Sequence, residues 1–236
     1  MAFGSPQSTY RITSSPDVTI SGAQTGFMSR VYAWMTAGLA LTGVTSLAVA
    51  SNPVWMHSVM AVRTPLLVGS FLLVLAFSFL AHKVNAAVAA MMFLGYAFTM
   101  GLLFSFLSVV YAPTAIFSAL AITGGTFFAL SLYGTITKKD LSSWGTFLFM
   151  GLIGIIIAGL VNIFVQSAAV SFVASCASVL VFAGLTAYDT QKLRQMHYQL
   201  SGQSSTGTLA ISGALTLYLD FINLFLSILR LMGSRR

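Results

Sequence analysis

The sequence has very few charged residues. Its 236 residues include four aspartates, no glutamate and eleven lysines or arginines, so charged residues make up only 6% of the chain. A soluble protein needs about a quarter of its residues charged to cover its surface. This scarcity excludes a soluble domain. The 57% share of hydrophobic residues indicates instead an all-α integral membrane protein.

Cysteine and histidine are equally scarce. Cys176 is the only cysteine, so it cannot form an internal disulfide, and it lies in an apolar run where a thiol is most often inert packing. His57, His82 and His197 fall in separate loops or helix ends, and no two have the spacing of zinc ligands. We therefore expect neither a disulfide framework nor a cofactor.

The net charge of +7 does not indicate a nucleic-acid partner. A nucleic-acid site needs a basic stripe, whereas here the basic residues stand singly or in pairs between apolar runs. That pattern is typical of loops that lie against anionic lipid headgroups. The expected partner is the lipid bilayer, and not nucleic acid.

The chain divides into three parts. Residues 1–27 are rich in Ser, Thr, Gly and Pro and lack the apolar core of a signal peptide, so we expect a disordered polar tail. Residues 28–233 form the membrane domain, and 234–236 form a basic end. Within the domain, seven apolar segments are each long enough to cross about 30 Å of hydrocarbon as a helix: near 30–50, 65–82, 86–110, 113–134, 144–165, 168–191 and 208–231.

Loop charges predict the orientation of these spans. Seven basic residues fall on one side of the membrane, against Arg63 alone in the loops of the other side: Arg11, Arg30, Lys83, Lys138, Lys139, Lys192 and Arg194. The positive-inside rule then places the N-terminus in the cytoplasm of a multi-pass cell-membrane protein. The basic C-terminus disagrees with the rule if all seven segments cross, so the side on which it lies stays open. Asp140, which precedes the fifth segment, is expected to act as a helix N-cap.

A polar stripe runs along the seventh segment. Its members recur every three or four residues, which places them on one face of a helix: Ser212, Thr216, Asp220, Asn223, Ser227 and Arg230. Such a face must point into the bundle. For the hydroxyl-bearing members, simple helix packing is the favoured explanation.

Asp189 and Asp220 are the two carboxylates expected at membrane depth. An isolated ionised carboxylate there costs several kcal/mol, and no basic residue lies deep in the bundle, so the cheapest state is one proton shared between the two. Loss of that proton leaves a charge density that favours a hard cation such as calcium. Tyr188 and Tyr218 stand within two residues of an aspartate, and either donate to it or merely face the interior. If the sixth helix ended near Arg194, Asp220 would lie about 10 Å deeper than Asp189.

Three stretches carry a family resemblance. The segments "ALTLYLDFINLFLSILRLMG" (214–233), "GLTAYDTQKL" (184–193) and "TKKDLSSWG" (137–145) resemble the Bax inhibitor family, the transmembrane Bax inhibitor motif proteins. The resemblance covers about residues 28–233. It implies seven helices with the seventh at the centre, and for a bacterial member the inner membrane.

The resemblance also implies a function. Relatives hold a pair of aspartates on helices six and seven and leak calcium across the membrane in a pH-dependent way, and Asp189 and Asp220 match that pair. In some relatives a basic residue at the end of helix two latches onto the helix-six aspartate; Lys83 is the first candidate here and His82 the second. Some relatives also carry a helix-two carboxylate, which this chain lacks between residues 64 and 82.

Three functions follow as hypotheses. The first is a pH-sensitive calcium leak channel in which calcium and protons are the ligands and no catalysis occurs. The second is a regulatory protein that restrains a membrane protease or stress pathway through a partner that the sequence does not specify. The third and weakest is a di-aspartyl intramembrane protease, because the bulky neighbours of Asp220 leave little room for a peptide.

Overall fold

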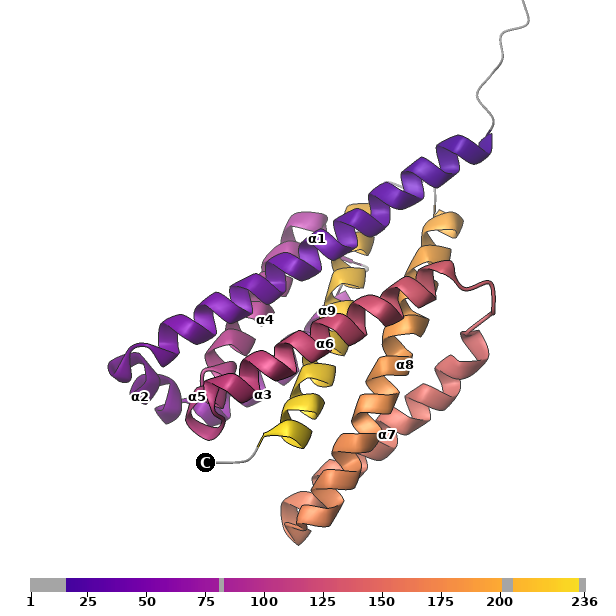
Figure 1. Ribbon diagram of the computed structural model, residues 1–236. Helices are drawn as coiled ribbons and strands as arrows, with labels where there is room; N and C mark the ends of the chain where they lie inside the picture. Colours follow the sequence, from indigo (N-terminus) through magenta and orange to yellow (C-terminus); the bar gives the residue numbers. More distant parts are fainter. Residues whose placement is uncertain (1–15, 81–82, 201–205, 234–236) are drawn as a thin grey trace, which may run out of the picture.

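The fold is a bundle of helices (Figure 1). The computed structural model describes residues 16–80, 83–200 and 206–233, and this part of the chain contains no strand. Seven helical stretches in it are long and apolar enough to cross a membrane: 26–50, 63–80, 86–110, 113–136, 142–165, 168–196 and 207–232. These match the seven predicted segments, so the predicted all-α fold with seven spans is confirmed.

Nine helices make up the described chain: α1 (Pro16–Ala50), α2 (Pro53–Ala61), α3 (Arg63–Leu80), α4 (Ala86–Phe104), α5 (Leu107–Val110), α6 (Pro113–Ile136), α7 (Ser142–Val165), α8 (Ala168–Leu200) and α9 (Thr206–Met232). α4 and α5 together form the third span, with a break at Ser105 and Phe106. Local sequence explains several starts. Pro53 and Pro113 occupy the first helical turn, where a missing N–H costs nothing.

Two elements differ from the predicted organisation. α1 begins at Pro16, so residues 16–27, which we expected in a disordered tail, are helical; residues 1–15 lie outside the described chain. α2 occupies the first loop, where the sequence predicted no helix. The side chain of Asn52 accepts hydrogen bonds from the backbone N–H groups of Val54 and Trp55, which caps this short helix.

Burial is very uneven among the spans. In α9, 67% of the span is buried within the protein, whereas no other span exceeds 28% and α7 reaches only 6%. α9 packs against α1, α4, α6 and α8. Its apolar faces carry fully buried side chains such as Leu217, Leu224 and Leu229. The polar stripe therefore belongs to the most deeply buried of the described spans.

The link between α6 and α7 is fixed by α8. Gln191 accepts a hydrogen bond from the backbone N–H of Leu141 at 2.9 Å and donates one to the carbonyl of Lys139 at 2.8 Å. Asp140 accepts from the N–H of Ser142 at 2.9 Å, but the N-cap position belongs to Leu141. Asp140 thus stabilises the start of α7 from the position before the N-cap, whereas we predicted Asp140 as the N-cap residue itself.

Candidate functional site

α8 is longer than predicted, and its length aligns the two aspartates. The helix continues to Leu200 and not merely to about Arg194, so Asp189 lies about 17 Å from that end at about 1.5 Å per residue. Asp220 lies about 21 Å from the start of α9 at Thr206 on the same scale. Because α8 and α9 are antiparallel neighbours, the two side chains reach similar depths.

The carboxyl groups of Asp189 and Asp220 lie close enough together to interact directly. Asp220 is only 4% exposed. Among the described residues no donor meets its buried Oδ2 atom. Two carboxylates can be hydrogen-bonded to each other only when one of them carries a proton. A hydrogen bond between the two would therefore need one protonated member, and ionisation of both would leave buried charge without a donor.

A cavity of about 880 Å³ contains both carboxyl groups and lies among α3, α7, α8 and α9. The stripe on α9 supplies Thr216, Asp220, Asn223, Ser227 and Arg230 to its wall. The cavity therefore follows most of the predicted stripe and extends from Lys192 on α8 to the last turn of α9.

The neutral stripe residues donate to their own helix. The hydroxyl of Thr216 donates to the carbonyl of Ser212 at 3.2 Å, the amide of Asn223 to Leu219 at 2.8 Å, and the hydroxyl of Ser227 to Asn223 at 2.7 Å. These bonds use O–H and N–H groups as donors, so the side-chain oxygens retain acceptor capacity. The wall of the cavity thus offers oxygen acceptors before and after Asp220 along α9.

Lys192 is a site residue that the sequence reasoning missed. It lies one turn after Asp189 on α8, attracts that carboxylate electrostatically and lines the same cavity. Its ammonium group also lies 5.6 Å from the centre of the Tyr188 ring, within cation–π range. The three-residue spacing in "DTQK" was the available signal, because side chains three apart on a helix are neighbours.

The two tyrosines have different surroundings. Tyr188 lines the cavity and covers Gly145 of α7, where an added Cβ would lie 2.5 Å from the ring. Tyr218 is fully buried on another face of α9, and its hydroxyl is hydrogen-bonded to that of Thr42 at 2.7 Å. In the described part of the chain, neither tyrosine donates a hydrogen bond to an aspartate. Tyr218 therefore joins α9 to α1.

Of the two candidate latch residues, the structure describes only Lys83. Lys83 is exposed at the end of α3, and no ion pair joins it to Asp189 in the described chain. His82 lies outside the described residues. The basic residue that attracts Asp189 is Lys192 of the same helix, and a latch from the second span stays a prediction.

A second hydrogen-bonded cluster lies beside the aspartates. The hydroxyls of Tyr32 and Ser131 are bonded to each other, and Ser131 is bonded to Thr190 at 3.1 Å. These residues belong to α1, α6 and α8, and Thr190 follows Asp189 directly. The cluster holds this part of α8 against two neighbouring helices.

The described residues contain no group of three or more His, Cys, Asp or Glu side chains that could hold a metal ion. Two carboxylates with neutral oxygens form a weaker donor set than a dedicated calcium cage, which takes six to eight oxygens. The arrangement therefore suits transient contact with a cation.

The chain is similar to a known protein family and to several bacterial proteins. The model of the family described as inhibitor of apoptosis-promoting Bax1 matches residues 24–236. The chain belongs to the Bax inhibitor family. An uncharacterized protein of Deinococcus radiodurans is 45% identical over 89% of this chain and 90% of its own length. The inner membrane protein YbhL of Escherichia coli K12 is 43% identical over 92% and 94%.

A third relative is an uncharacterized protein of Rickettsia prowazekii. It is 39% identical to this Bax inhibitor family member over 95% of this chain and 96% of its own length. The predicted family is thereby confirmed. Together with the seven spans, these matches make the chain a multi-pass membrane protein.

Proposed function

We propose that this protein is a pH-sensitive cation leak pathway of the bacterial inner membrane, with calcium as the permeant ion and no catalytic activity. The observation that carries the proposal is the cavity that contains both membrane-depth carboxylates. Asp140, by contrast, lies outside this cavity. The inner membrane is proposed from the relative YbhL.

The proton controls the charge of the pathway. With one proton shared, Asp189 and Asp220 hold each other through the hydrogen bond and carry a single negative charge. Loss of the proton breaks that bond and leaves two negative charges that must separate or attract a cation. Calcium, a hard cation, favours such oxygen ligands. Proton release and cation entry are therefore coupled.

The cavity has cationic residues toward both ends, Lys192 on α8 and Arg230 in the last turn of α9. Like charge repels an entering cation, so passage depends on the attraction of the aspartates between them. A pathway with two such barriers conducts slowly. This property favours a leak over a fast channel.

The decisive experiment measures calcium release from vesicles. Protein reconstituted in calcium-loaded vesicles should release the ion at a rate that changes between about pH 6 and pH 8, the range over which a buried carboxylate pair can titrate. The double variant Asp189→Ala/Asp220→Ala should lose both the release and its dependence on pH. Release equal to that of the wild type in this variant would refute the proposal.

Two further variants show whether a loss of calcium release comes from misfolding. Asp220→Asn preserves the size of the side chain and a hydrogen bond to Asp189, so the bundle should fold while the pH response disappears. Asp140→Asn removes an exposed carboxylate outside the cavity and should leak like the wild type.

Calcium and protons should compete for the same oxygens. We expect the apparent calcium affinity of the purified protein to rise as the pH rises, because ligands must be deprotonated to hold a metal ion. Isothermal titration at several pH values measures this trend. An affinity that is independent of pH would place calcium away from the pair.

A regulatory role is the second candidate, and the description of the matching family, inhibitor of apoptosis-promoting Bax1, favours it. Co-purification of a membrane partner that survives loss of both aspartates would separate this role from ion conduction. A protease would instead cleave a reporter transmembrane peptide and lose that activity in each single aspartate variant.

A further inference from the structure

Two pairs of basic residues that are far apart in the sequence come together where α6 ends and α7 begins. Lys138 and Lys139 belong to the link between these helices, whereas Lys192 and Arg194 belong to α8. We call these four residues the basic corner. In the sequence each pair is ordinary for a loop beside a membrane; their combination is a feature of the folded chain.

Hydrogen bonds from α8 hold the two pairs together. The side chain of Gln191, next to the basic pair of α8, is bonded to the backbone of Lys139 and Leu141. The guanidinium group of Arg194 donates to the backbone carbonyl of Thr135, in the last turn of α6. The link is therefore fixed against α8. The backbone that carries its lysines is ordered before any ligand binds, which lowers the entropic cost of binding.

Negative charge does not cancel the basic corner. In the α6–α7 link and the second half of α8, the acidic residues are Asp140 and Asp189. Asp140 is exposed, whereas Asp189 lies inside the cavity, where it interacts with Asp220 and with Lys192. If the charge of Lys192 is assigned to Asp189, three basic side chains still stand against one exposed carboxylate. The corner therefore attracts anions.

Exposed aromatic side chains place the basic corner at the membrane interface. Tyr133 in the last turn of α6 is 49% exposed, and Trp144 in the first turn of α7 is 59% exposed. Phe147, one turn further along α7, is 67% exposed, and its ring packs edge to face against Trp144. Tyrosine and tryptophan collect at the level of the lipid headgroups. The corner thus lies at headgroup depth, beside an apolar surface of α7 that acyl chains can contact.

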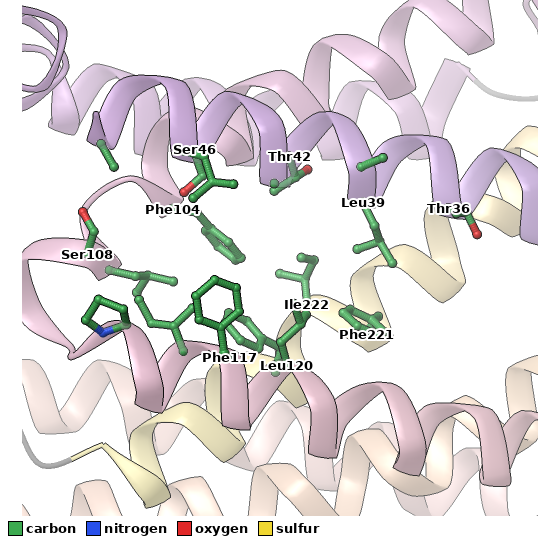
Figure 2. A pocket seen from close by; sticks show the side chains of 18 residues that line it. Thr36, Leu39, Thr42, Ser46, Phe104, Ser108, Phe117, Leu120, Phe221 and Ile222 are labelled. Carbon is green, nitrogen blue, oxygen red and sulfur yellow. The ribbon is translucent and has the colours of Figure 1, made fainter. Parts of the chain in front are cut away.

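The cavity between α1 and α6 offers no comparable selection of a ligand by charge. Figure 2 shows the apolar and hydroxyl-bearing side chains around it, and among the described residues its lining includes no charged one. The basic corner differs in having both charge and an apolar neighbour. A soluble anion would use the charge alone, whereas a lipid also contacts Trp144 and α7.

We infer that the basic corner binds the phosphate of an anionic phospholipid, such as phosphatidylglycerol, whose acyl chains lie along α7. Basic pockets between membrane helices are typical sites for such headgroups. This inference does not depend on the proposed ion pathway, because it concerns the outer surface of the bundle and not the carboxylate pair.

Tryptophan quenching tests the inference on the full chain. In the variant Trp34→Phe/Trp55→Phe, Trp144 is the only tryptophan and reports on the lipid beside the corner. The variant is reconstituted in vesicles of equal phosphatidylethanolamine and phosphatidylglycerol, in which only one of the two lipids carries bromine on its acyl chains. We expect the binding constant at Trp144 to favour phosphatidylglycerol by at least about fivefold, the effect of one basic residue near an anionic headgroup.

Charge variants of the link identify the cause of this preference. Lys138→Gln/Lys139→Gln should bring the ratio of the two binding constants close to one. Lys138→Arg/Lys139→Arg keeps both charges and should keep the preference. Both lysines are exposed, so these variants should fold, and circular dichroism checks this. If the double glutamine variant does not fold, Lys139→Gln alone should lower the preference by about fivefold.

A second reporter serves as the matched control. The variant Trp34→Phe/Trp144→Phe leaves Trp55 on α2, which lies at the other end of the bundle from the α6–α7 link (Figure 1). Arg63 is the only lysine or arginine between residues 31 and 82. Trp55 should therefore show a much smaller preference between the two lipids.

Four results would overturn the inference. The first is equal quenching of Trp144 by the two brominated lipids. The second is a preference that persists in a folded glutamine variant or is lost in the arginine variant. The third is a preference at Trp55 as large as that at Trp144. The fourth is loss of the preference when inorganic phosphate replaces chloride at the same ionic strength, because the corner would then bind a soluble anion.

Discussion

α9 and α7 are both spans of similar length, yet they occupy opposite environments. In α9, 67% of the span is buried against 6% in α7, although α7 is the more apolar of the two. In a soluble protein the more apolar helix would be inside. In a bilayer, lipid solvates apolar side chains as well as protein does, so the polar stripe decides which helix enters the bundle.

The same residue type illustrates the difference. Leu217 of α9 is fully buried, whereas Leu160 of α7 is 56% exposed. Both are leucines at membrane depth, so their contribution to stability depends on whether their neighbours are fixed protein atoms or mobile lipid. Packed protein cannot refill a void, but lipid can.

The largest expected effect comes from this leucine pair. Leu217→Ala should lower the free energy of unfolding by about 2–5 kcal/mol, because it leaves a cavity in packed protein. Leu160→Ala should change it by less than about 1 kcal/mol, since lipid fills the space. Thermal unfolding of the purified proteins in the same detergent measures both. Equal losses would show that α7 is as tightly packed as α9.

Two glycines of α6 extend the comparison between packed and unpacked positions to a single helix. A Cβ at Gly134 of α6 would lie 2.3 Å from the backbone carbonyl oxygen of Ala187, whereas one at Gly125 would meet nothing within 4 Å. Gly134→Ala should cost about 1–3 kcal/mol through overpacking. Gly125→Ala should be neutral or stabilise by up to about 1 kcal/mol, because alanine favours the helix. Unfolding midpoints that move equally would contradict the close approach of α6 and α8.

The smallest effect concerns Asp140, at the water-exposed start of α7. Hydrogen bonds from Ser142 lower the pKa of Asp140 from its ordinary value. A carboxylate whose pKa is lowered by folding stabilises the folded state above its unfolded pKa, and this contribution disappears as the pH falls through the folded pKa. The stability difference between the wild type and Asp140→Asn should therefore shrink as the pH falls below about 4. Unfolding midpoints measured from pH 3 to pH 7 test this; a difference that grows on acidification would contradict it.

Much of the fold followed from residue patterns. The seven apolar runs predicted the spans within a few residues, because a helix must satisfy its own backbone in lipid and needs about 20 residues to cross. The three-to-four spacing of Thr216, Asp220 and Asn223 predicted a shared face, and these residues do line one cavity. The helical residues 16–27 and the helix α2 were missed, because polar or short segments carry no strong periodicity.

The site was less predictable. Whether Asp189 faced Asp220 depended on where α8 ends, and the polar sequence after Arg194 did not mark that point. Lys192 was overlooked in favour of Lys83, which lies at the end of a different helix. The environment of Tyr218 was also undetermined, since its partner Thr42 is far away in the chain.

The sequence alone determined that this chain enters a membrane, how many times it can cross, and which face of the seventh span must avoid lipid. These properties depend on the composition and helical periodicity of each segment taken separately, because each segment enters the bilayer as its own helix. Only the tertiary structure decided which helices meet, how deeply each aspartate lies, and where cavities remain between the helices. Such contacts depend on the shapes and lengths of separate helices, and no single segment encodes them.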